Sequence, residues 1–280
     1  MESNNTKEKY SLCYGIVVFF IIVIVLMLII KLQTTSIMDN PEPFIPIYEK
    51  HAIIEFSEYN SDWNNLCNII AEKADEFHEC IIIECTKEYL LIIANALVFM
   101  IENLSIPIIV TDNIEMGVKL YKNNNMLPYN VMIAANKRLF LATTAQQHGT
   151  SLVGKEPETR KIINPGNMSF NQVDPGIDIS VINSSDHIDL IQSCSESDAL
   201  ILNIKNSDHL SDSLNQQLKI LTDVGIPSIL INQLNGDLVI PSYKMNTETA
   251  YAKLAVIMSK LEDKNLIEPV FAKNTHNEFL

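Results

Sequence analysis

The stretch Cys80–Asn113 constrains the fold of this chain more than any other part of the sequence. It begins with an entirely apolar run, Cys80–Ile83, and ends with a second one, Ile106–Val110. Between these runs, apolar residues recur at helical spacing, at Leu91, Ala94, Leu97, Val98 and Ile101. Continuous apolar strands joined by a helical crossover are typical of a parallel sheet that is buried on both faces. The sequence therefore predicts a β-α-β unit within an α/β fold.

Composition excludes several classes of function. The net charge of −14 and the absence of a Lys/Arg run argue against a nucleic-acid partner, which requires a basic face. The chain has only 8 glycines, and it contains none of the motifs G-x-G-x-x-G, G-x-x-x-x-G-K-[ST], H-E-x-x-H or G-x-S-x-G. Nucleotide-binding, zinc-protease and serine-hydrolase functions therefore have no support in the sequence.

Residues 12–30 form an uncharged apolar run of about nineteen residues, which is the length that a helix needs to cross a bilayer. The run ends directly at Lys31 without a small-residue cleavage site, so a signal-anchor is favoured over a cleaved signal peptide. The alternative is a buried core helix. We expect a single transmembrane helix at 12–30, preceded by a tail at 1–11.

The charges that flank this run predict its orientation. Lys7 and Lys9 precede it and Lys31 follows it, which favours a cytoplasmic amino terminus. The expected localisation is therefore a membrane, with a single pass. Five cysteines do not form a dense disulfide framework, and Cys80 and Cys85 are interpreted as buried apolar thiols.

The remaining sequence divides where its pattern changes. Residues 31–46 are polar and rich in proline, which predicts a linker. Residues 47–176 contain the β-α-β unit and form a first domain. From Ile177 the alternation of apolar strands and amphipathic helices begins again, which predicts a second parallel-sheet domain at 177–265. Residues 266–280 are expected to be a tail.

Cys80–Asn113 also resembles a segment of the bacterial-type L-asparaginases and glutaminases. In that family an apolar strand is followed by H-G-T-D-T, by a helix similar to A-L-S-F-M-L-E-N-L and by a strand similar to K-P-V-I-V-T-G. This chain has A-L-V-F-M-I-E-N-L at Ala96–Leu104, followed by S-I-P-I-I-V-T-D-N. Weaker similarity covers His51 to Leu261. The resemblance implies two asparaginase-like, parallel-sheet α/β domains, here preceded by one transmembrane helix.

Most of the family's catalytic positions are not matched. H-G-T-D-T becomes E-C-T-K-E at Glu84–Glu88, so that only Thr86 survives and the family's Asp becomes Lys87. The family's Lys, which assists deprotonation, becomes Gln147, and a neutral amide cannot take up a proton. The family's T-G-G-T loop, whose first Thr is the usual nucleophile, has no counterpart in this sequence. The resemblance therefore implies the fold more than the activity.

Two interpretations of Thr86 remain open. As the candidate catalytic residue, a vestige of the family motif, it would need Lys87 or Glu88 as its base within about 3.2 Å of its hydroxyl, next to backbone N–H groups that stabilise an oxyanion. The alternative is that Thr86 is an ordinary helix cap. Ser57 is the candidate substrate-binding residue, and its alternative is an ordinary turn serine.

Two functional hypotheses follow. The first is a membrane-anchored, asparaginase-like pseudoenzyme that has lost most catalytic residues and acts as a non-catalytic binding or structural protein, because losing several cooperating groups leaves little activity. The second is an L-asparaginase/glutaminase-type amidohydrolase with residual activity through Thr86. No cofactor and no metal are expected. The resemblance implies a homo-oligomer, and the first hypothesis adds an unknown protein partner.

Overall fold

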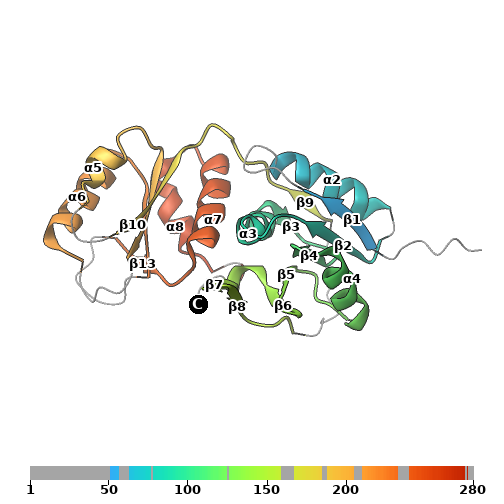
Figure 1. Cartoon of the computed structure of the whole chain (residues 1–280). Coiled ribbons are helices and arrows are strands. Elements are labelled where there is room, and N and C mark those ends of the chain that lie inside the picture. Colours follow the sequence, from blue (N-terminus) through green and yellow to red (C-terminus); the bar gives the residue numbers. More distant parts are fainter. Residues whose placement is uncertain are drawn as a thin grey trace, which may run out of the picture. The chain divides into compact units, whose positions relative to one another are not determined.

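The computed structural model describes residues 51–56, 63–76, 78–124, 126–158, 167–184, 188–204, 210–232, 240–274 and 276. Glu49–Leu280 form one compact unit, and in its described part the fold is α/β, with a five-stranded sheet, a four-stranded sheet and two small two-stranded sheets (Figure 1). The α/β class predicted from the sequence is confirmed.

The expected tail at 1–11, transmembrane helix at 12–30 and linker at 31–46 lie outside the described residues. Among the residues that are described, no helix combines the length and the apolarity needed to cross a membrane.

The first sheet has the strand order β1-β2-β4-β5-β6. Its strands are β1 (His51–Glu55), β2 (Cys80–Glu84), β4 (Ile108–Thr111), β5 (Val131–Ala135) and β6 (Arg138–Leu141). The first four run parallel, and β6 returns antiparallel to β5. Ile81, Ile82 and Ile83 are completely buried because helices cover both faces of the sheet. The predicted β-α-β unit is confirmed.

Three helices cover this sheet: α2 (Trp63–Asp75), α3 (Leu90–Met100) and α4 (Ile114–Asn123). Side chains alternate between the faces of a strand, so Ile81 and Ile83 join the core formed with α2 and α3, whereas Ile82 faces α4. The buried residues of α2 recur at helical spacing and share one face of the helix: Trp63, Leu66, Cys67 and Ile70.

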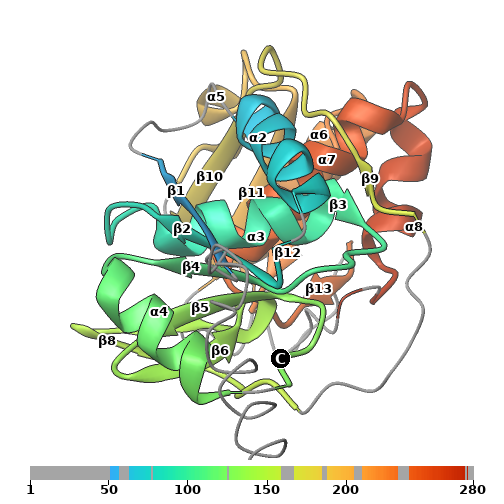
Figure 2. The same ribbon diagram turned by 90° about the vertical axis from the view of Figure 1, so that its right-hand side faces the viewer.

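Helix α3 is buried on every side, because it lies between the first sheet and helix α7 (Thr247–Lys260). In Figure 2, α3 passes in front of α7. The helix ends at Met100 rather than at Ile101. Ile101 begins β3 (Ile101–Glu102), which pairs antiparallel with β9 (Ser169–Phe170), and Asn103 follows with a positive φ of 55°.

A hairpin that the apolar pattern does not predict joins β5 and β6. Its two turn residues, Asn136 and Lys137, both have positive φ angles, 52° and 62°. Two consecutive positive φ angles are the signature of a tight turn whose twist matches that of the flanking strands. The chain then forms a 3-10 turn, η1 (Ala142–Thr144), and the small hairpin β7 (Gln146–His148) and β8 (Ser151–Val153).

The second sheet has the strand order β10-β11-β12-β13, and all of its neighbouring strands are parallel. Its strands are β10 (Ile179–Ser184), β11 (Ala199–Ile204), β12 (Ser228–Ile231) and β13 (Ser242–Tyr243). The helices that follow them are α5 (Leu190–Ser193), α6 (Asp212–Asp223), α7 and α8 (Ile267–Phe271). The second parallel sheet expected after Ile177 is thus present, while the domain boundaries at 176 and 265 stay predictions.

The segment 266–280, which is expected to be a tail, has helical structure in its described part. It contains helix α8, which follows the 3-10 turn η2 (Lys264–Leu266). Ile267 and Phe271 of this helix are buried, and the Phe271 ring packs against Tyr243 with the ring centroids 5.1 Å apart. The burial of these two side chains holds the helix on the core.

Candidate active site

The carboxyl edge of the first sheet is formed by the ends of β1, β2, β4 and β5. The strand register aligns Glu55 with Glu84, and Glu84 with Thr111. The turn from β2 into α3 leaves the sheet at this edge, where α/β sheets generally place ligands. The segment Glu84–Glu88 thus lies at the carboxyl edge of the first sheet.

Thr86 is exposed in this turn. Its carbonyl oxygen accepts a hydrogen bond from the Tyr89 backbone N–H at 3.0 Å, and α3 begins only at Leu90. The N-cap of α3 is Tyr89, which makes no side-chain capping bond. Thr86 is therefore not the cap of this helix, and that alternative interpretation is wrong.

Among the described residues, no side chain makes a hydrogen bond with the Thr86 hydroxyl. Hydrogen bonds join it neither to Lys87 nor to Glu88, although both side chains are exposed in the same turn. The Lys87 ammonium instead donates to the carbonyl oxygen of Thr150 at 3.2 Å. The assignment of Thr86 as a vestigial catalytic residue stays a prediction.

The contact between Lys87 and Thr150 brings two parts of the predicted site together. Thr150 lies in the turn of the β7–β8 hairpin, and Gln147 lies on β7 of the same hairpin. The Gln147 side-chain amide donates to the Gly149 carbonyl oxygen at 2.6 Å, and the turn uses the positive φ of Gly149, 59°. Lys87 and Gln147, which the resemblance places at the family's Asp and Lys positions, thus both donate to carbonyl oxygens of the β7–β8 turn.

Cys85 is the other side chain of this turn with nucleophilic chemistry. Its side chain is buried, and burial, assisted by the negative charges of Asp112 and Glu84, raises the pKa of its thiol to about 12. Because the thiolate is the reactive form of cysteine, Cys85 is inert near neutral pH. Cys67, Cys80, Cys85 and Cys194 are all free and buried, as expected for Cys80 and Cys85.

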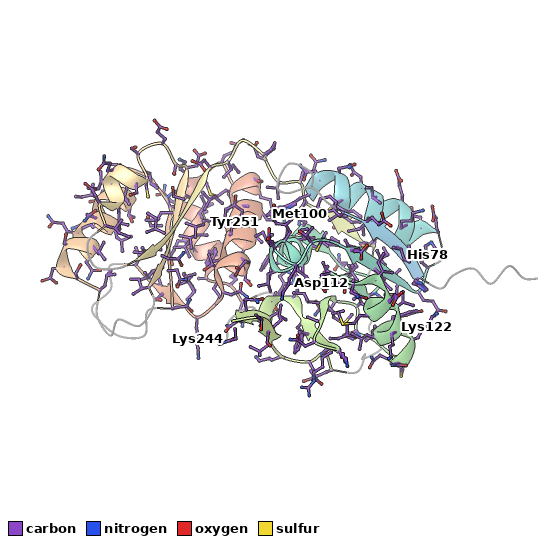
Figure 3. The ribbon with its side chains drawn as sticks, viewed as in Figure 1. His78, Met100, Asp112, Lys122, Lys244 and Tyr251 are labelled. Carbon is purple, nitrogen blue, oxygen red and sulfur yellow. The ribbon has the colours of Figure 1, made fainter. Side chains whose placement is uncertain are left out.

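The end of β4 contributes polar groups that the sequence analysis passed over. The buried Thr111 hydroxyl donates toward the carbonyl oxygens of Asn113 and Ala134, at 3.0 and 3.3 Å, and accepts from the Asn113 N–H at 3.1 Å. Asn113 caps α4 through a bond from the Met116 N–H at 2.9 Å. Asp112, labelled in Figure 3, lies between them and is exposed. The signal in the sequence is a run of polar residues, T-D-N, directly after a buried strand.

Glu84 connects the two strand ends. One of its carboxylate oxygens accepts a hydrogen bond from the Ile114 N–H, the first residue of α4, at 3.4 Å. A carboxylate at the amino end of a helix is stabilised by the helix dipole. The described part of the site is thus an acidic, hydrogen-bonded edge, in which Glu84 links the end of β2 to the start of α4.

The second candidate residue, Ser57, lies outside the described residues, so its assignment as a substrate-binding residue stays a prediction. Within the described part of the chain, no group of three or more His, Cys, Asp or Glu side chains is arranged to hold a metal ion.

The carboxyl edge of the second sheet carries a network of asparagines. The Asn203 amide donates to Asn183 Oδ1 at 2.9 Å and to Thr247 Oγ1 at 3.1 Å, while its Oδ1 accepts from Asn232 at 3.0 Å. Asn232 has a positive φ of 64°. The corresponding signal in the sequence is an asparagine at or next to the end of each of the strands β10, β11 and β12.

Comparison with solved structures identifies the fold as that of the L-asparaginases. L-asparaginase I of Vibrio cholerae has a structure similar to this chain, with a TM-score of 0.67 and 19% identity over 80% of this chain and 82% of that chain. The thermostable L-asparaginase of Thermococcus kodakarensis has a TM-score of 0.64 and 17% identity over 80% of this chain and 82% of that chain. A probable cytoplasmic L-asparaginase of Campylobacter jejuni has a TM-score of 0.60 and 12% identity over 80% of this chain and 98% of that chain.

No family model and no curated protein sequence matches the chain. At identities below 20%, the structural similarity establishes the asparaginase-like fold, as predicted from the resemblance at Ala96–Leu104. Activity has to be inferred from the residues of the site.

Proposed function

We propose that this chain is a membrane-anchored binding protein with an asparaginase-like fold and without amidohydrolase activity. One observation carries the proposal. The two side chains at the family's acid–base positions, Lys87 and Gln147, both donate hydrogen bonds to the turn of the β7–β8 hairpin.

Deprotonation of a threonine hydroxyl requires a nearby acceptor for its proton. A lysine ammonium has no acceptor, and an amide oxygen is far too weak a base. Cys85 offers no replacement nucleophile, because burial and two neighbouring carboxylates keep its thiol protonated. Together with the missing T-G-G-T loop, these features support a loss of the chemistry rather than a rearrangement of it.

The anchor is the apolar run at 12–30, and the charges around it favour a cytoplasmic amino terminus. In this arrangement the α/β part lies on the opposite side of the membrane, where an unknown protein partner would meet it. Confinement to a plane raises the effective concentration of the copies and favours homo-oligomers.

The test is ammonia release from asparagine and glutamine by the purified full chain in detergent. We expect no release above that of the variant T86V. The matched control T222V removes a hydroxyl that donates within helix α6, to the Leu218 carbonyl oxygen. Hydrolysis at an ordinary enzymatic rate that T86V abolishes and T222V retains would overturn the proposal.

A further inference from the structure

A cavity of about 350 Å³ lies between helices α3, α7 and α8, away from the β2–α3 turn. Its volume is in the range of pockets that bind small molecules. Neither the resemblance nor the comparisons assign a ligand to it. Its lining combines apolar side chains with three lysines, Glu102 and His276.

The apolar part of the lining comes from all three helices. Phe99 of α3 and Val256 of α7 are buried, and Val270 of α8 is partly buried beside them. These side chains present hydrocarbon to the cavity, and an apolar ligand group placed there would gain about 25 cal/mol for each Å² removed from water.

The charged part of the lining is cationic. Three lysines, Lys253, Lys260 and Lys273, line the cavity, against one carboxylate, Glu102. The chain as a whole has a net charge of −14, so this local excess of positive charge runs against its composition. A concave site with one sign of charge attracts a ligand of the opposite sign.

The lysines differ in how firmly they are held. Lys253 is only 3% exposed, and its ammonium donates to the Lys273 carbonyl oxygen at 2.6 Å and lies 4.9 Å from the centre of the Phe271 ring. Lys260 pairs with Glu102 at 2.9 Å, at an exposed position. The Lys273 side chain is exposed and makes no hydrogen bond or ion pair with the described residues. The lining thus combines one buried, hydrogen-bonded lysine, Lys253, with two exposed lysines, Lys260 and Lys273.

From this arrangement we propose that the cavity binds a small organic carboxylate with an apolar body. The carboxylate contacts Lys260 and Lys273, and the body packs on Phe99, Val256 and Val270. A charged oxygen gives stronger hydrogen bonds to an ammonium than a neutral one does, so the site discriminates against uncharged molecules of the same shape. This ligand site is independent of the proposed loss of catalysis.

The test is isothermal titration calorimetry of the full chain in lipid nanodiscs, with protein-free nanodiscs as the blank. The probe is 4-phenylbutyrate, its neutral counterpart is 4-phenylbutanamide, and acetate supplies the charge without the apolar body. We expect saturable binding of one 4-phenylbutyrate per chain, with the amide and acetate at least about tenfold weaker. Raising the salt concentration weakens binding of the probe, because the exposed lysines are screened.

Variants connect the binding to this cavity. The double variant K260Q/K273Q is expected to bind the probe at least about fivefold more weakly, and V270D, which adds a carboxylate to the lining, at least about tenfold more weakly. The control K264Q removes a lysine from the neighbouring turn η2, outside the cavity, and leaves binding unchanged. Thermal unfolding of each variant checks that the fold is kept.

Three results would overturn the proposal. They are no saturable binding of 4-phenylbutyrate, equal binding of the amide, and binding by K260Q/K273Q that equals that of K264Q. The proposed loss of hydrolysis is measured separately, by ammonia release, so either proposal can fail without the other.

Discussion

The hydroxyl of Thr249 on α7 donates a hydrogen bond to Asn95 Oδ1 on α3 at 2.8 Å, and both residues are completely buried. The Asn95 amide in turn donates to the Leu91 carbonyl oxygen at 2.8 Å. This pair joins a helix that covers the first sheet to a helix that covers the second. A buried polar pair of this kind fixes the alignment of the two helices, since neither group finds another partner if they slide.

Replacing Thr249 with valine should therefore destabilise the fold. In T249V the Asn95 oxygen loses its donor while it stays buried, which costs about 1–3 kcal/mol in the free energy of unfolding. The double variant N95L/T249V, which removes both polar groups, should be less destabilised than T249V. Urea unfolding followed by circular dichroism measures both, and the exposed-site control T222V should stay within about 0.5 kcal/mol of wild type. A loss in T249V no larger than in T222V would contradict this role.

Cys67 should make stability fall at alkaline pH. Burial raises the pKa of its thiol from the ordinary value of 9.0 to about 12, so the folded state keeps a proton that the unfolded state releases. The stability contributed by the neutral thiol is complete below pH 9 and is lost as the pH rises from 9 toward 12. At pH 9.5 the loss is on the order of 1 kcal/mol.

The measurement compares wild type with C67A by urea unfolding at pH 7.5 and at pH 9.5. We expect the penalty of C67A to be smaller at pH 9.5, because alanine has no proton to lose. L66A, a cavity variant on the same helix without a titrating group, should show the same penalty at both pH values. If C67A behaves like L66A, the account of the Cys67 thiol is wrong.

Restoring single catalytic residues should not restore hydrolysis. The variant K87D/Q147K reinstates the family's Asp and Lys, yet it leaves the chain without the T-G-G-T loop that supplies the usual nucleophile. Groups that act as a unit fail together, so two of them give little without the third. Ammonia release by K87D/Q147K should equal that of wild type, and a clear gain would mean that Thr86 is a competent nucleophile.

Membrane topology is open to a direct test in sealed vesicles that expose their cytosolic face. With a cytoplasmic amino terminus, residues 32–280 should resist added protease until detergent opens the vesicles. A soluble cytosolic marker attached to the amino terminus should be digested in the same sample. Digestion of residues 32–280 in intact vesicles would reverse the proposed orientation.

The sequence predicts the buried elements well, because burial leaves a strong pattern. The run Cys80–Ile83 is apolar on both faces and is a central strand, and Leu66 and Ile70 mark the buried side of α2. Ala199–Ile204, in the region where the sequence predicts alternating strands and helices, is likewise a strand that is buried throughout. In each case the spacing of apolar side chains alone fixes the element.

Elements and contacts that depend on turns or on distant residues are predicted less well. The β5–β6 hairpin rests on positive φ angles at Asn136 and Lys137, and no apolar pattern marks such a turn. Helix α8 is short, and its place in the core follows from two residues, Ile267 and Phe271. The contact of Lys87 with Thr150 spans 63 positions in the sequence. The resemblance brought Lys87 and Gln147 to notice, but only the fold shows that both donate to one turn.

The central claim is the absence of catalysis at the β2–α3 turn, and a single-turnover experiment tests it most directly. The full chain in detergent is held in excess over isotopically labelled asparagine, and the conversion to aspartate is followed by mass spectrometry, with T86V as the reference. We expect wild type and T86V to convert the substrate at the same background rate. Conversion of the bound substrate by wild type at a rate well above that of T86V would contradict it.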